Sequence, residues 1–231
     1  MDEQEVSGHL RLPAWRRRTA GEHRWPAALA VVAAAVMQLS LPKRLAMPPR
    51  FLLPTLEILL LVGLTAADPG RINRRERHLR LTGIVLIAAV SLANMWSAAR
   101  LVTELLRSKP AAGSAAALIV NGGSIYLTNI IAFALWYWEM DRGGPASRSH
   151  GVECYPDFLV PQMSSPDLAP PEWEPAFFDY LYVSFTNATA FSPTDVMPLS
   201  RPAKAMMLLQ SAVALSTVAL VIARAINILQ Q

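Results

Sequence analysis

The sequence predicts an all-α membrane protein with about five transmembrane helices and a re-entrant helix and loop before the last of them. Apolar residues make up 53% of the chain and charged residues only 16%, whereas a soluble domain usually carries about a quarter charged residues. The apolar residues lie in long blocks, and five of these blocks approach the roughly 20 residues that a helix needs to cross the hydrocarbon core. One further apolar block, at 177–190, is too short to cross the hydrocarbon core.

The long blocks define the expected helices and divide the chain into three regions. Transmembrane helices are expected at residues 25–42, 51–67, 80–100, 115–138 and 203–229. The regions are a basic polar N-terminal arm (1–24), a three-helix transmembrane region (25–114) and a C-terminal unit (115–231).

The charge is distributed unevenly along the chain. Residues 1–80 hold 13 Lys and Arg against 7 Asp and Glu, while residues 139–179 hold 2 against 8. Basic residues at membrane boundaries set orientation and contact anionic lipid headgroups. We therefore expect a multi-pass protein of the cell membrane, with the lipid bilayer as a partner and a cytoplasmic N-terminus. Nucleic acid is not expected as a partner, since no basic globular domain is present to bind it.

The second expected helix contains one acid, Glu57. An ionisable residue inside a span is costly and usually faces a partner or a water-filled cavity. Alternatively, Glu57 lies close enough to the Arg50 end of the helix to reach the membrane interface. Both interpretations fit the sequence.

The C-terminal unit has the order of a re-entrant structure. It consists of an outer helix (115–138), a polar loop (139–176) of irregular composition, a short aromatic helix with a polar loop (177–202), and an inner helix (203–229). The outer helix contains small residues, Gly122 and Gly123, which permit close helix approach. Non-helical backbone at membrane depth is tolerated only where protein buries it or it lines a water-filled cavity.

The short helix and the loop after it resemble the potassium-channel-like pore-loop superfamily. The stretch 180–200 is similar to that family's pore helix and selectivity filter, and the matching positions are Tyr180, Ser184, Phe185, Thr186, Thr189, Asp195, Pro198 and Ser200. The resemblance covers the C-terminal unit only. It implies a homo-oligomer, by analogy a tetramer, with a pore on its symmetry axis.

The loop that aligns with the family's filter lacks both filter glycines. Ser192 and Thr194 replace them, and Pro193 fixes its own backbone and restricts the residue before it. An ordinary potassium filter, built from inward-pointing carbonyls, should therefore not form. A wider ring of side chains that includes Asp195 would favour monovalent cations weakly. The filter-like loop comprises Thr189, Ala190, Phe191, Ser192, Pro193, Thr194 and Asp195.

The inner helix carries four polar residues that are candidates for lining a pore: Gln210, Ser211, Ser216 and Thr217. Alternatively, such residues bond to their own helix or to a neighbouring helix, which is the more frequent role of Ser and Thr in a membrane span.

Two indications of orientation disagree. A cytoplasmic N-terminus followed by four spans places the 139–176 loop in the cytoplasm, so the re-entrant segment would dip in from inside. Ordinary potassium channels receive theirs from outside. The unit is inverted, the N-terminus is outside, or one span is miscounted.

The function expected from the sequence is that of a channel-like membrane protein, an oligomeric ion pore of weak cation preference. The alternative is a non-conducting pore-loop scaffold with a structural or regulatory role. No catalytic motif stands in a supporting context, so an enzyme is not expected, and neither are catalytic residues, a metal site or a cofactor.

Overall fold

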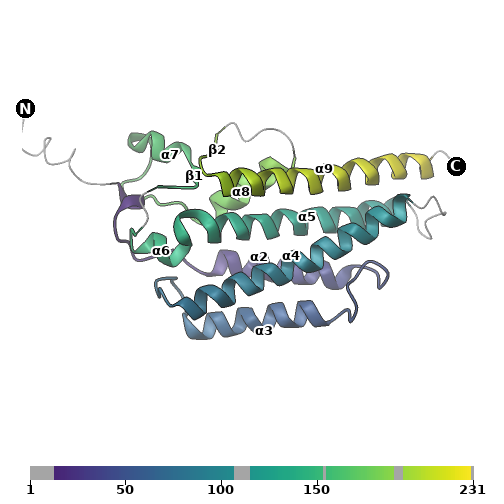
Figure 1. The fold of residues 1–231 in the computed structure, drawn as a ribbon, viewed down its shortest axis with the longest axis horizontal. Coiled ribbons are helices and arrows are strands. Elements are labelled where there is room, and N and C mark those ends of the chain that lie inside the picture. The colour runs from purple at the N-terminus through teal and green to yellow at the C-terminus, as the bar shows by residue number, and fades with distance from the viewer. Residues whose placement is uncertain (1–12, 107–114, 153–154, 190–194, 230–231) are drawn as a thin grey trace, which may run out of the picture.

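The computed structural model describes residues 13–106, 115–152, 155–189 and 195–229. The long helices run side by side as an elongated bundle, and the short elements gather at one end, the loop end, where α5 ends and α9 begins (Figure 1). The long helices and α8 are α2 (Trp25–Ser40), α3 (Leu52–Ala67), α4 (Arg77–Leu106), α5 (Ala115–Met140), α8 (Phe177–Ala188) and α9 (Arg201–Leu229). The other elements are η1 (Ala14–Arg16), η2 (Asp141–Gly143), α6 (Pro145–Ser149), β1 (Phe158–Leu159), α7 (Pro161–Ser164), η3 (Pro166–Leu168) and β2 (Met197–Pro198).

Three of the described helices are long and apolar enough to cross a membrane, which indicates a multi-pass membrane protein. They are α4, α5 with its continuation to Ser149, and α9. Helices α2 and α3 are apolar but have 16 residues each. At 1.5 Å per residue this gives about 24 Å, against a hydrocarbon core of about 30 Å. The prediction of about five transmembrane helices is therefore confirmed for three of them, while α2 and α3 form at the expected positions as shorter apolar helices.

The helix ends differ from the expected ones where polar residues continue a helix beyond its apolar block. The block at 80–100 belongs to a helix that runs Arg77–Leu106, and the block at 203–229 to one that begins at Arg201. Basic residues are good helix formers that hydropathy alone does not detect. The short aromatic helix spans Phe177–Ala188.

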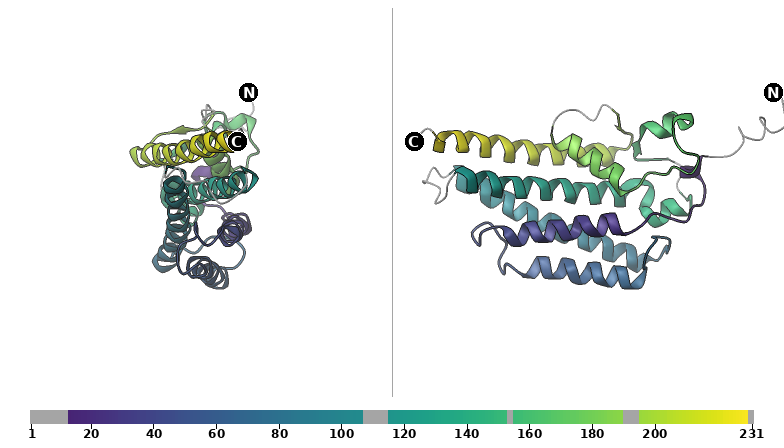
Figure 2. Two further views of the ribbon diagram at one scale, coloured as in Figure 1. Left: turned by 90° about the vertical axis from the view of Figure 1, so that its right-hand side faces the viewer. Right: turned by 180° about the vertical axis from the view of Figure 1, so that it is seen from behind.

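Helix α5 lies at the centre of the bundle. It contacts α2 and α4 as well as α8 and α9, and the end-on view of Figure 2 shows α9 on one side of it and α2 and α3 on the other. Ala134 and Tyr137, near its loop end, are fully buried. Gly122 faces α9 so closely that a Cβ atom there would lie 2.7 Å from a methyl carbon of Val221, whereas a Cβ atom at Gly123 would meet nothing within 4 Å.

The arm before α2 is attached to the segment between α3 and α4. His23 forms an antiparallel bridge with Arg71, and the Arg24 guanidinium pairs with the Asp68 carboxylate at 3.1 Å. These contacts fix the start of α2 beside the end of α3 and the basic start of α4.

The loop expected at 139–176 contains the short elements η2, α6, β1, α7 and η3, and it is buried in part. Arg142 adopts a left-handed conformation at φ 52° and is 1% exposed. Its guanidinium donates to the backbone carbonyl of Trp15 in the arm. The loop is therefore packed onto the end of the bundle.

We predict that Gly122→Leu destabilises the protein and that Gly123→Leu does not. A leucine at position 122 must push α5 and α9 apart at Val221, and overpacking costs about 1–3 kcal/mol, which corresponds to a fall of roughly 2–10 °C in melting temperature for a chain of this size. Thermal unfolding of the two variants in the same detergent provides the measurement. Equal melting temperatures would contradict the close approach of the two helices.

Candidate functional site

Helix α8 enters the bundle from the loop end and stops part of the way along it. Its 12 residues correspond to about 18 Å, well short of the hydrocarbon core. The described chain resumes at Asp195 and is again at the loop end, where β2 pairs with β1 through Phe158 and Pro198 (Figure 1). The described segment thus begins and ends at the loop end of the bundle, with α8 lying beside α5 and α9.

The first turn of α8 is held by acids. Its Asp179 carboxylate accepts the Ala176 N–H at 2.8 Å, and the Glu22 carboxylate accepts the Phe177 N–H at 3.0 Å. Glu22 also pairs with Arg148 at 2.7 Å and accepts the Trp138 indole N–H at 2.7 Å. Burial raises the pKa of the Glu22 carboxyl above its ordinary value, and the Arg148 guanidinium and the N–H donors oppose that shift.

Asp141 joins α8 to the loop. It is fully buried and accepts the Tyr180 hydroxyl at 2.6 Å. Its other oxygen accepts the backbone N–H groups of Asp157 and Phe158, at 2.7 and 3.3 Å. One carboxylate therefore positions α8 and the start of β1 together.

A second polar cluster, which we call the mid-bundle network, fixes the distal half of α8. The Gln210 amide of α9 donates to the backbone carbonyl of Ser184 at 2.9 Å and to its hydroxyl at 2.7 Å. The Gln210 oxygen accepts the Tyr137 hydroxyl at 2.6 Å and the Asn187 amide at 2.9 Å. Ser184 in turn donates to the Ile130 carbonyl of α5 at 2.7 Å. These contacts satisfy polar groups that would be costly at membrane depth.

The structure describes the two ends of the filter-like loop, Thr189 and Asp195, and they lie in different surroundings. Thr189 is half-buried and its hydroxyl donates back to the Phe185 carbonyl at 3.1 Å. Asp195 is exposed and accepts the Tyr182 hydroxyl at 2.9 Å, which ties the returning chain to α8. The other members, Ala190, Phe191, Ser192, Pro193 and Thr194, lie outside the described residues.

The four candidate pore-lining residues of α9 fall on different faces. Gln210 and Thr217 are buried, Gln210 in the mid-bundle network and Thr217 with its hydroxyl on its own helix. Ser211 is half-buried and donates to the Asn187 side-chain oxygen at 3.2 Å. Ser216 alone of the four is exposed, and its hydroxyl donates to the carbonyl four residues earlier.

Glu57 faces the interior of the bundle. It is 0% exposed and lies beside Gln38 of α2, which is also buried. It lies far along the chain from the re-entrant unit, and no contact that the structure describes joins the two.

Within the described part of the chain, no element covers one side of α8 and α9. On α8, Phe178, Tyr182 and Phe185 are 73%, 46% and 50% exposed and share one face. On α9, Leu208 and Leu215 are 72% and 66% exposed. In the most apolar stretch of α9 28% of the residues are buried, against 56% in α5. We call this surface the free face.

Sequence reasoning missed the residues that hold α8 in place. Glu22, Asp141 and Arg148 belong to the polar arm and the polar loop and are not among the residues that the sequence singles out. Their positions relative to α8 depend on contacts between residues 39 to 155 positions apart, for which a single sequence carries no signal. Among the described residues no group of three or more His, Cys, Asp or Glu is placed to hold a metal ion.

No protein-family model matches the chain, and no curated protein or solved structure is significantly similar to it.

We predict that Gln210→Leu destabilises the protein and that Ser216→Ala leaves it unchanged. The leucine removes four hydrogen bonds to Ser184, Tyr137 and Asn187, and each polar group left unpaired costs about 1–3 kcal/mol. Ser216 bonds only to its own helix, so it is a matched polar control. Thermal unfolding in detergent gives the comparison, and an unchanged melting temperature for Gln210→Leu would contradict the network.

Proposed function

We propose that the chain is one subunit of an oligomeric membrane protein built on the pore-loop plan, and that the assembly passes ions with a weak preference for cations. The observation that carries this proposal is the re-entrant course of α8. α8 packs against both α5 and α9, these helices satisfy its polar groups, and the chain returns to the end at which it began.

The free face supports an oligomer. Non-helical backbone at membrane depth must be buried in protein or border water, and a helix that stops there ends in such backbone. Phe178, Tyr182 and Phe185 of α8 have no cover within the described part of one chain. A second copy packed against this face would bury the aromatic side chains of α8 together with Leu208 and Leu215 of α9. By resemblance to the pore-loop superfamily the assembly is a tetramer.

The cation preference rests on Asp195. In a symmetric assembly its carboxylate is repeated around the axis, and rings of carboxylates favour cations. Of the four inner-helix candidates only Ser216 is exposed, so it is the one best placed to border the same path.

In this proposal α2 and α3 complete five crossings. Each is about 24 Å long, and local thinning of the bilayer accommodates a short span at modest cost. Basic residues are enriched at the cytoplasmic boundary of membrane proteins. This rule places the loop end in the cytoplasm, because Arg24, Arg71, Arg77 and Arg80 lie there. The re-entrant segment enters from that side.

A non-conducting scaffold is the alternative, and one observation favours it. Gln210 and Thr217 point into the single subunit, so the free face is mostly apolar and aromatic. Such a surface is suited to stable packing between copies. An assembly that forms but does not conduct would identify this function.

We expect native mass measurement in detergent to give a tetramer. Leu215→Trp, on the free face, should shift the population toward smaller species, because a bulky side chain there obstructs the packing of copies. Val62→Trp on α3 is the matched control, since Val62 is 59% exposed on the opposite side of the bundle. A monomeric wild-type protein would exclude a central pore.

We also expect the reconstituted protein to conduct in planar bilayers and Asp195→Asn to move its reversal potential in a KCl gradient toward zero. An asparagine oxygen still accepts the Tyr182 hydroxyl, so the fold is retained while the charge is lost. Asp167→Asn, an exposed carboxylate in η3, is the control and should change nothing. A silent oligomer would contradict the pore and favour the scaffold.

A further inference from the structure

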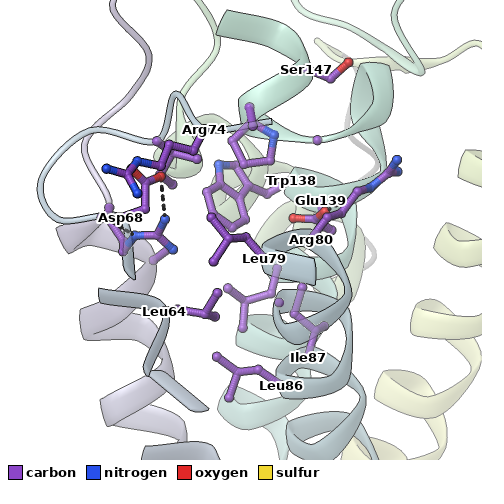
Figure 3. A pocket seen from close by; sticks show the side chains of 18 of the residues that line it. Leu64, Asp68, Arg74, Leu79, Arg80, Leu86, Ile87, Trp138, Glu139 and Ser147 are labelled. Carbon is purple, nitrogen blue, oxygen red and sulfur yellow. Dashed lines mark hydrogen bonds and ion pairs between the residues drawn. The ribbon is translucent and has the colours of Figure 1, made fainter. Parts of the chain in front are cut away.

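A pocket opens at the loop end on the side of the bundle away from α8. It has a volume of about 300 Å³ and lies between α2, α3, α4 and α5, at the lower end of the roughly 300–1,000 Å³ of ligand pockets. Figure 3 shows its two parts. Leu64, Leu86 and Ile87 line the deeper part, and Arg74, Arg80 and Trp138 lie around the mouth.

The mouth of the pocket carries more basic than acidic side chains. Five arginines and three acids line it: Arg24, Arg74, Arg75, Arg77, Arg80, Asp68, Glu76 and Glu139.

All three acids are already paired. Asp68 pairs with Arg24 at 3.1 Å and lies 4.0 Å from Arg74, while Glu139 pairs with Arg80 at 3.4 Å. Glu76 lies 3.0 Å from His78. Within the described part of the chain, Arg75 and Arg77 have no acidic partner, so the mouth presents two uncompensated positive charges.

The polarity of the pocket follows the long axis of the bundle. Four of the five arginines lie before and in the first turn of α4, and the apolar lining continues deeper along the same helix at Gly83, Leu86 and Ile87. At the mouth, the arginines would neutralise a negatively charged group of a ligand. In the deeper part of the pocket, burial of a polar group would carry a desolvation cost, so only an apolar group is favoured there. A ligand that fits both parts has an anionic head and an apolar tail.

We propose that this pocket binds one anionic phospholipid, with its phosphate between Arg75 and Arg77 and one acyl chain beside Gly83. The chain crosses a membrane, so the bilayer presents such molecules at this level continuously. Basic pockets between transmembrane helices are suited to anionic headgroups. The apolar depth distinguishes this ligand from a soluble phosphate compound, which would leave the deeper part without a partner. The proposal is independent of whether the protein conducts.

Gly83 provides a test that leaves the arginines intact. A Cβ atom at Gly83 would meet nothing within 4 Å, so a leucine there fits without strain and occupies the deeper part of the pocket. Gly63 on α3 is the matched control, because it has equally open surroundings and does not line the pocket.

The experiment measures binding of dioleoyl phosphatidylglycerol and dioleoyl phosphatidylcholine to the full chain in detergent by native mass spectrometry. We expect one phosphatidylglycerol to bind with clear preference. The double variant R75Q/R77Q should weaken binding of phosphatidylglycerol about thirtyfold, at about fivefold for each arginine near the headgroup. The variant R18Q/R201Q removes the same charge from exposed residues outside the pocket and should bind as the wild type does. Gly83→Leu should weaken binding, and Gly63→Leu should not.

Three results would overturn the proposal. Equal losses in R75Q/R77Q and R18Q/R201Q would indicate diffuse charge attraction, and equal binding of both lipids would exclude recognition of the headgroup. Binding of glycerol phosphate that competes with the lipid and is unaffected by Gly83→Leu would assign the mouth to a soluble phosphate compound. Melting temperatures of the variants without added lipid separate these results from misfolding.

Discussion

A helix that enters a bilayer and turns back must find hydrogen-bond partners within its own protein, because the hydrocarbon core supplies none. α8 is held in this way along its whole length. Asp141 and Glu22 fix its first turns, and Gln210 with Tyr137 fixes its distal half. These partners come from the arm, α5, the loop and α9. The positions of all four segments therefore depend on hydrogen bonds that pair the polar groups of one short helix.

The partners also stabilise one another. Arg148 is buried between Glu22 and the carbonyl groups of Trp138 and Asp141, at 2.6–2.9 Å. A buried ion pair contributes little net stability over an apolar pair, but removal of one member leaves an uncompensated charge that costs about 3–5 kcal/mol. The arrangement therefore selects one position for the arm and the loop, because any displacement exposes a charge to an apolar interior.

Hydropathy predicted the helices well because each apolar block is long and its ends are marked by polar residues or proline. The block at 80–100 became Arg77–Leu106, since charged residues extend a helix without adding hydropathy. The short helix at Phe177–Ala188 was also predictable, from the length of the block at 177–190. The orientation of Gln210 toward Ser184 was not, because the sequence of α9 alone does not say which face meets α8. Glu22, Asp141 and Arg148 were missed for the same reason.

The bond between Glu22 and the Phe177 N–H joins residues 155 positions apart. During synthesis the arm leaves the ribosome long before Phe177 exists, and Arg148 follows only after four further helices, α2 to α5. Until then the Glu22 carboxylate has to remain in water or at the headgroups. The Glu22 carboxylate thus completes its contacts only when α8 packs against the end of α5, so this early segment is among the last to reach its final position.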